Sequence, residues 1–375
     1  MNKQPIYRLL VTVFNILPMK KNKIFFLGYY GSQYGCNPKY LSEYIVQHHP
    51  EWDVVWGFTQ PKRHELPNIR KVRYLSFRFF YELCTSQVLV TNYRMPSYFW
   101  RRSGQFYIQT WHSSLRLKAI EADAINTIPA HYIKMAKHDS QQINILLSGC
   151  HKSTEIFKQA FWYDGFIAPT GTPRIDVLMH PDENRNRRIK HSLGLKDGDQ
   201  IVLYAPTFRE DHGHDAYNLD VETLCNCLHC RWGGTWKVLL RLHPHLLNTS
   251  LDGMLKSCLN VTEYDDIQEL LCISDVVVSD YSGLIFDYVF TYRPCFLYVP
   301  DLTHYLKTER QLYFNIDELP FPQIQGNDEL DSVITQFDEQ KYHKDVDAFL
   351  QKMGTFETGH ACEKVYKHIT EYLSL

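Results

Sequence analysis

The chain has 375 residues, of which 44% are apolar and 22% are charged, and its formal net charge is −2. These values are typical of a folded soluble protein that is long enough for two domains of ordinary size. A net charge this close to zero gives no overall attraction to nucleic acid, so basic residues matter only where they cluster. The ten cysteines are scattered, and a chain of this size needs no disulfide bonds, so we expect them to be reduced.

The first segment, "IYRLLVTVFNILPMKKNK" (residues 6–23), combines an apolar face with a basic end. Its apolar run is too short to span a bilayer, and no small-residue cleavage site follows it. Two interpretations stay open. Residues 1–19 form an amphipathic segment on an anionic membrane, with Lys20, Lys21 and Lys23 at the headgroups, or they form a first helix packed on its own domain.

From Lys23 onward, strand-like and helix-like segments alternate. The predicted strands of the first half are "KIFFLGYYG" (23–31), "DVVWGF" (53–58), "QVLVTN" (87–92), "FYIQTWH" (106–112) and "INILLSG" (143–149). Those of the second half are "IVLYAPTF" (201–208), "WKVLLRLH" (236–243), "DVVVSD" (275–280) and "PCFLYV" (294–299). A polar stretch at 179–200 separates the halves. We therefore expect a first domain over 20–185 and a second domain, with the terminal helices, over 186–375.

Alternation in both halves predicts an α/β fold with two doubly wound, Rossmann-like parallel-sheet domains that face each other across a cleft. In such folds, ligands bind beyond the carboxyl ends of the strands. The residues that follow directly after each apolar run are therefore the candidates for chemistry.

Two candidate groups lie in the first half. His112 ends a predicted strand, close in sequence to Arg116 and Lys118, and a neutral imidazole there can take a proton from an alcohol near neutral pH. The alternative is a structural histidine bonded within a loop. Gly171 and Arg174 lie in "PTGTPRIDVL" (169–178), which predicts a tight turn facing the cleft or an ordinary loop with a surface ion pair.

Hydroxyl, basic and acidic residues, together with one glycine, end or follow three predicted strands of the second half. They are Thr207, Arg209, Arg241, His243, Ser279, Asp280, Ser282 and Gly283. Arginine forks suit phosphate oxygens, and Ser279, Ser282 and the amides after them can bind a phosphate at a helix N-terminus. Asp280 would then orient an imidazole, pair with an arginine or accept a ribose hydroxyl. The alternative for Ser279 or Ser282 is a helix cap.

Metal binding is not favoured by the sequence. "CNCLHC" (225–230) contains three cysteines and a histidine, but the second ligand pair of a zinc site is missing. The apolar residues around it fall at helical spacing, which favours a helix with thiols facing the core. No carboxylate cluster with the spacing of a magnesium site is evident. We therefore expect no cofactor, although a divalent metal stays possible.

Several of these motifs together resemble the CDP-glycerol glycerophosphotransferase family, the teichoic-acid primases and polymerases and their capsule-synthesis relatives. The resemblance rests on "QTWHSSLRLK", "GTPRIDVL", "YAPTFRED", "LRLHPH" and "DDIQELLCISDVVVSDYSGLIFDYVFTYRPCFLY", which occur in the family's order. One departure is Ser113, where we expect a glycine after the histidine.

The resemblance implies a GT-B fold, a CDP-linked polyol phosphate donor such as CDP-glycerol, and a lipid-linked glycan acceptor at the cytoplasmic face of the membrane. The first domain would then lie on the acceptor side and the second would bind the CDP-linked donor. His112 would be the base and His243 a donor-phosphate or leaving-group contact, and the other candidates, Gly171 and Arg174 included, would bind the donor. A polyol phosphate would be transferred while CMP leaves. Two rival functions stay open: a nucleotide-sugar glycosyltransferase or epimerase on the same fold, and a non-catalytic scaffold of envelope-polymer assembly.

Overall fold

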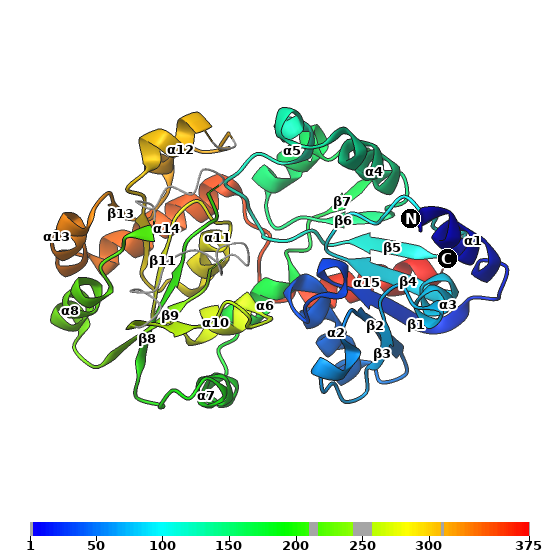
Figure 1. Ribbon diagram of the computed structural model, residues 1–375, viewed down its shortest axis with the longest axis horizontal. Helices are drawn as coiled ribbons and strands as arrows, with labels where there is room; N and C mark the ends of the chain where they lie inside the picture. The colour runs from blue at the N-terminus through cyan, green and yellow to red at the C-terminus, as the bar shows by residue number, and fades with distance from the viewer. Residues whose placement is uncertain (1–2, 210–216, 243–256, 309–310, 375) are drawn as a thin grey trace. The chain divides into compact units, whose positions relative to one another are not determined.

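The computed structural model describes residues 3–209, 217–242, 257–308 and 311–374 (Figure 1). The chain divides into two compact units, which we describe separately. Unit 1 comprises Met1–Ser114, Ile120–Val177 and Thr355–Leu375, and unit 2 comprises Leu115–Ala119 and Leu178–Gly354.

Unit 1 is built on a seven-stranded parallel sheet with the strand order β3-β2-β1-β4-β5-β6-β7. Its strands are β1 (Lys20–Leu27), β2 (Asp53–Phe58), β3 (Arg70–Arg73), β4 (Ser86–Thr91), β5 (Phe106–Gln109), β6 (Ile145–Leu147) and β7 (Phe166–Ala168). Its helices are α1 (Gln4–Phe14), α2 (Cys36–His48), α3 (Phe77–Thr85), α4 (Ala130–Ser140), α5 (His151–Ala160), α6 (Pro173–Met179, where the chain leaves the unit) and α15 (Ala361–Ser374). The central strands are apolar runs because helices cover both faces of a parallel sheet.

Unit 2 contains a six-stranded parallel sheet with the order β10-β9-β8-β11-β12-β13. Its strands are β8 (Gln200–Ala205), β9 (Trp236–Leu240), β10 (Leu259–Asn260), β11 (Val276–Ser279), β12 (Cys295–Tyr298) and β13 (Gln323–Ile324). Its helices are α7 (Glu183–Ser192), α8 (Val221–Trp232), α10 (Ile267–Ile273), α11 (Ile285–Tyr288), α12 (Leu302–Thr308), α13 (Leu330–Thr335) and α14 (Glu339–Met353). Two doubly wound α/β units are therefore present, and this confirms the predicted fold class.

The division of the chain differs from the expected boundary in three ways. Leu115–Ala119, inside the expected first domain, belong to unit 2. We placed the boundary between residues 185 and 186, whereas the chain passes from unit 1 to unit 2 between Val177 and Leu178, within α6. We also assigned the terminal helices to the second domain, but α15, red in Figure 1, packs in unit 1. There the Trp52 Nε1 donates a hydrogen bond of 3.1 Å to the Tyr366 hydroxyl, 314 residues away in the sequence. No local pattern predicts so distant a contact.

Helix α1 has one apolar face packed inside unit 1 and another exposed. Val11 and Phe14 are buried, and the Phe14 ring lies 4.7 Å from the ring of Phe77 at the start of α3. Helix α1 therefore packs on its own domain through this face, and contact of its other face with a membrane stays a prediction. On the outer side, Leu9 is 63% exposed, and Ile16, just after the helix, is 80% exposed. No described helix combines the length and apolar character that crossing a bilayer requires.

Lys23 differs from the expectation that placed it at lipid headgroups with Lys20 and Lys21. Its side chain is fully buried in β1, and its Nζ lies 2.8 Å from Oε2 of Glu82 on α3. A buried ammonium group needs such a partner because its desolvation is costly. Lys23 is therefore a structural residue, whereas Lys20 and Lys21 are exposed.

Candidate active site

The two sheets have the same order over their first six strands, and this order indicates where each sheet is expected to bind a ligand. In each sheet the strand order reverses at one pair of neighbours, β1 and β4 in unit 1, and β8 and β11 in unit 2. In open α/β sheets, ligands bind outside the carboxyl ends of the strands at such a switch point. The loops that follow these strands are therefore where functional side chains are expected.

In unit 1, His112 lies just beyond the carboxyl end of β5, and its side chain is half-buried. Its ring stacks on that of Tyr29, which follows β1, with ring centres 5.4 Å apart and an angle of 2° between the planes. Among the described residues, its Nδ1 is buried without a hydrogen-bond partner. The His112 ring thus packs against the loop that follows β1, one of the two strands of the switch point.

Backbone strain gathers around this histidine. Non-glycine residues with positive φ include Tyr29 and Tyr30 after β1, Cys36 at the start of α2, and Trp111 after β5. This conformation costs energy for side chains with a Cβ, and it persists only where the surrounding structure enforces it. Clusters of such residues occur at functional sites, which supports this edge of the sheet as one.

Cys36, at the start of α2, is a buried thiol beside two basic groups. The Arg174 Nη1 donates to its Sγ at 3.4 Å. Burial alone would raise the pKa of this thiol, but the Arg174 guanidinium and the His112 ring outweigh it and lower the pKa to about 6. We grouped Arg174 with the donor-binding residues, most of which lie in the second half. It lies in unit 1, where it and His112 both interact with the Cys36 thiol.

Gly171 also lies in unit 1, and its φ of +79° is in the left-handed region that favours glycine. A Cβ at Gly171 would lie 2.5 Å from Oε2 of Glu357, which also favours glycine at this position. Glu357 is buried and accepts hydrogen bonds from the Thr172 amide at 2.9 Å and from its hydroxyl at 2.8 Å. Gly171 thus shapes a buried carboxyl site, and no described contact gives it a ligand.

The Glu357 carboxyl makes stability depend on pH. Burial raises its pKa from 4.5 to about 7, so the folded chain retains a proton that the unfolded chain releases. Stability should therefore fall as the pH rises from about 4.5 to about 7, and then level off. We expect the midpoint of thermal unfolding to show this fall in the native chain and a shallower one in Glu357→Gln. Parallel pH profiles for the two proteins would contradict the assignment.

In unit 2, the switch point is occupied by an ion-pair cluster. The Asp280 carboxylate, after β11, accepts from the Thr207 amide at 3.0 and 2.9 Å, and lies 2.9 Å from Nη2 of Arg209. The Arg209 Nε lies 2.7 Å from Asp301. The structure thus brings Thr207, Arg209 and Asp280 together. Of the three roles considered for Asp280, pairing with an arginine is confirmed.

Arg209 differs from the expected phosphate ligand. Its guanidinium is buried, and it lies 4.9 Å from the ring centres of both Tyr281 and Tyr305, whose rings stack on each other at 3.5 Å. Burial would lower its pKa, but the carboxylates of Asp280 and Asp301 raise it above its ordinary value. With its charge matched by two acids, this side chain holds the loops after β8 and β11 in place.

The serines after β11 also have local partners. Ser279 is buried and donates to the Ala205 carbonyl at 2.7 Å, so its hydroxyl joins two strands. Ser282 and Gly283 are half-buried, and the Ser282 Oγ accepts from the Leu284 amide at 3.4 Å. The helix that follows, α11, has only four residues. Phosphate binding at the N-terminus of this helix stays a prediction.

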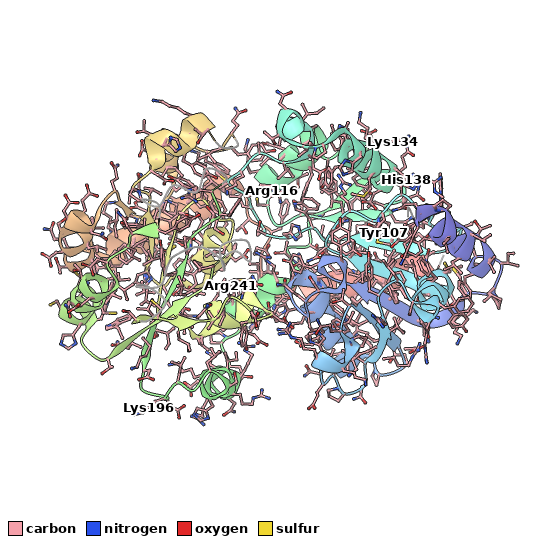
Figure 2. The ribbon with its side chains drawn as sticks, viewed as in Figure 1. Tyr107, Arg116, Lys134, His138, Lys196 and Arg241 are labelled. Atoms are coloured by element: carbon pink, nitrogen blue, oxygen red, sulfur yellow. The ribbon has the colours of Figure 1, made fainter. Side chains whose placement is uncertain are left out.

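Arg241 follows β9 and is labelled in Figure 2. Its side chain is half-buried, and its Nη1 donates to the Tyr264 carbonyl at 2.7 Å. His243 lies outside the described residues. Arg116 and Lys118, which we considered as neighbours of His112, belong to unit 2, where the Lys118 Nζ lies 5.4 Å from the Tyr305 ring centre.

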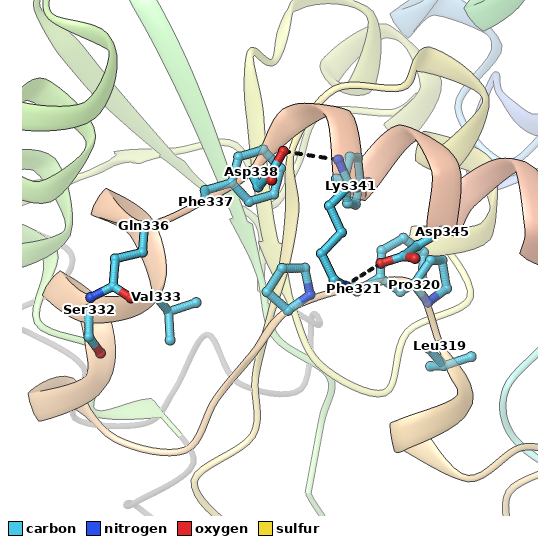
Figure 3. A pocket seen from close by; sticks show the side chains of 12 residues that line it. Leu319, Pro320, Phe321, Ser332, Val333, Gln336, Phe337, Asp338, Lys341 and Asp345 are labelled. Atoms are coloured by element: carbon cyan, nitrogen blue, oxygen red, sulfur yellow. Dashed lines mark hydrogen bonds and ion pairs between the residues drawn. The ribbon is translucent and has the colours of Figure 1, made fainter.

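A separate hollow of about 460 Å³ lies between the segment 319–322 and the helices α13 and α14 (Figure 3). Apolar and proline side chains form much of its wall, and Lys341 and Asp345 pair beside it at 2.6 Å. It contains none of the candidate residues, and it does not lie at the carboxyl end of the sheet. We therefore do not assign the chemistry to it.

Comparison with known proteins decides the family. A family model described as CDP-Glycerol:Poly(glycerophosphate) glycerophosphotransferase matches residues 9–371. The chain belongs to this family. A glycerophosphotransferase-family relative from Staphylococcus aureus, the teichoic acid glycerol-phosphate transferase, is 31% identical over 388 residues, which cover 98% of both chains.

Some of the similar proteins are longer. The teichoic acid poly(glycerol phosphate) polymerase of Bacillus subtilis is 29% identical over 376 residues, covering 96% of this chain and 50% of that protein. The chain thus spans about half the length of this relative. Among solved structures, the wall teichoic acid polymerase TagF has a TM-score of 0.84 at 28% identity, covering 98% of this chain and 94% of that one. The fold is therefore GT-B-like.

Proposed function

We propose that the chain transfers glycerol phosphate from CDP-glycerol to a hydroxyl of a lipid-linked glycan or polymer in cell-envelope synthesis, with release of CMP. The observation that supports this most is the match over 98% of both chains with a teichoic acid glycerol-phosphate transferase. The position of His112 beyond a strand end of unit 1 adds a group that can act as a base.

The proposed reaction is a phosphoryl transfer. The acceptor hydroxyl attacks the phosphorus that carries the glycerol, an oxygen–phosphorus bond forms, and the bond to the CMP oxygen breaks. His112 takes the hydroxyl proton, and Arg241 and His243 remain the proposed contacts of the donor phosphates in unit 2. Catalysis then depends on positioning and on charge stabilisation, and the scheme includes no cofactor, since CDP-glycerol is a substrate.

A donor panel tests this proposal. The protein is incubated with a lipid-linked acceptor and with CDP-glycerol, CDP-ribitol or a nucleotide sugar, and the released nucleotide is measured. We expect CMP from CDP-glycerol. Release of a nucleoside diphosphate from a nucleotide sugar would favour a glycosyltransferase, and donor binding without turnover would favour a scaffold.

We also propose that the outer side of α1 rests on the cytoplasmic face of an anionic membrane. Apolar side chains at least 48% exposed gather there, namely Ile6, Leu9, Val13 and Ile16. The exposed Lys20 and Lys21 follow directly and would meet anionic headgroups. Such a peripheral contact would confine the enzyme to the layer that holds a lipid-linked acceptor.

Replacing Leu9 and Ile16 together by aspartate should weaken binding to anionic vesicles at least tenfold, because two apolar side chains no longer enter the interface. Both are mostly exposed, so the fold should be kept. Leu306→Asp is the matched control, since Leu306 on α12 is 56% exposed in unit 2. Vesicle co-sedimentation measures the bound fraction. Equal binding by the double variant and the control would refute this surface.

A further inference from the structure

The loop that carries His112 is held in a strained shape. Trp111, directly before the histidine, has a φ of +49°, which bulky L-residues rarely adopt. Such a conformation persists only when neighbouring groups over-determine it. A specific set of contacts must therefore hold this loop.

Asn37, the second residue of α2, provides those contacts. Its side chain is fully buried, and its Nδ2 lies 3.3, 3.2 and 2.8 Å from the carbonyl oxygens of Thr110, Trp111 and His112. Its Oδ1 accepts from the Arg174 amide at 3.0 Å. One carboxamide thus ties the start of α2 to the His112 loop and to the first turn of α6.

We propose that Asn37 is a positioning residue for His112, setting the backbone from which the imidazole projects. The effect of Asn37 on turnover rests on the proposed function, in which His112 is the base. A general base works only within hydrogen-bond reach of its proton, and a displacement of about 1 Å can cost about a hundredfold in rate. Since the Asn37 side chain is buried against backbone groups, its effect on turnover should pass through His112.

A double-mutant cycle separates positioning from general support. Asn37→Ala should lower turnover roughly ten- to a hundredfold in the native background. In the His112→Ala background it should lower the residual turnover no more than about twofold, because the group that it positions is gone. An equal loss in both backgrounds would overturn the inference.

Asn144→Ala is the matched control. The Asn144 Oδ1 accepts from the amide of Tyr107, labelled in Figure 2, at 2.9 Å, so this asparagine also pins β5, but at the far end from His112. It should lower the unfolding temperature and leave turnover near the native value. A turnover loss as large as that of Asn37→Ala would show that loosening β5 alone accounts for the effect.

A second readout needs no turnover. The ring signal of His112 in a nuclear magnetic resonance spectrum is assigned by its loss in His112→Ala. Asn37→Asp keeps the size of the side chain and its acceptor for the Arg174 amide, but it removes the Nδ2 donor. This variant replaces Asn37→Ala in the experiment if Asn37→Ala does not fold. Both Asn37→Ala and Asn37→Asp should shift the His112 ring signal, whereas Asn144→Ala should not. An unshifted signal would overturn the positioning role. Absence of native turnover would refute only the proposed function.

Discussion

His112→Ala is expected to lower turnover of CDP-glycerol by roughly two to four orders of magnitude, the usual cost of losing a general base. The ring is half-buried and stacked on Tyr29, so its removal should leave folding and donor binding nearly unchanged. The measurement is the rate of CMP release at saturating donor, together with KM.

The control for this variant is another histidine of unit 1. His138, on α4 in Figure 2, bonds the Phe99 carbonyl at 2.9 Å and is not at the sheet edge that carries His112. His138→Ala should retain turnover close to the native value. A His112→Ala protein with near-normal turnover would remove His112 from the mechanism.

Asp280→Ala is expected to destabilise unit 2 by about 3–5 kcal/mol, the usual cost of breaking a buried ion pair from one side. It leaves the buried Arg209 with Asp301 alone and leaves the Thr207 amide without its acceptor. Unfolding in urea, followed by a probe in unit 2, measures the change in free energy.

The matched control is an exposed ion pair in the same unit. Lys341 and Asp345 lie 2.6 Å apart on α14, and both are largely exposed, so Lys341→Ala should change stability little. An Asp280→Ala protein that unfolds at the native urea concentration would contradict the structural role. That result would favour a phosphate-binding role for Arg209.

The interior strands could be predicted from the sequence because each is an apolar run buried on both faces. β2 has the predicted bounds, Asp53–Phe58. Strands at or near the sheet edges were missed for physical reasons. β3 is the basic tetrapeptide Arg70–Arg73, and β10 has two exposed residues, so neither carries an apolar run.

The site was only partly predictable. Ligands are expected beyond the carboxyl ends of the strands, and this expectation correctly placed His112 there. It did not single out Tyr29, Cys36 and Asn37. Tyr29 lies in a glycine-containing loop after β1 that carries few charges, and Cys36 and Asn37 begin α2 directly after that loop. The same expectation pointed to this loop. The backbone bonds of Asn37 are visible only in three dimensions.

The ion pairs of Arg209 were not predicted because its acidic partners are remote in the sequence. Arg209 and Asp301 are 92 residues apart, and local sequence does not show whether an arginine is matched by such an acid. The same limit applies to Glu357, which is 185 residues from Thr172. Strand-end position identifies where polar residues gather, but long-range pairing decides which of them stay available to a ligand.

The most direct test of the proposed phosphotransfer follows the phosphate itself. CDP-glycerol is prepared with radioactive phosphorus in the phosphate next to glycerol, and it is incubated with the protein and a lipid-linked acceptor. If glycerol phosphate is transferred, the label moves to the acceptor, unlabelled CMP is released, and His112→Ala slows both. If the label stays in the soluble nucleotide as CDP while glycerol reaches the acceptor, the bond cleaved is a different one, and the proposed reaction is wrong.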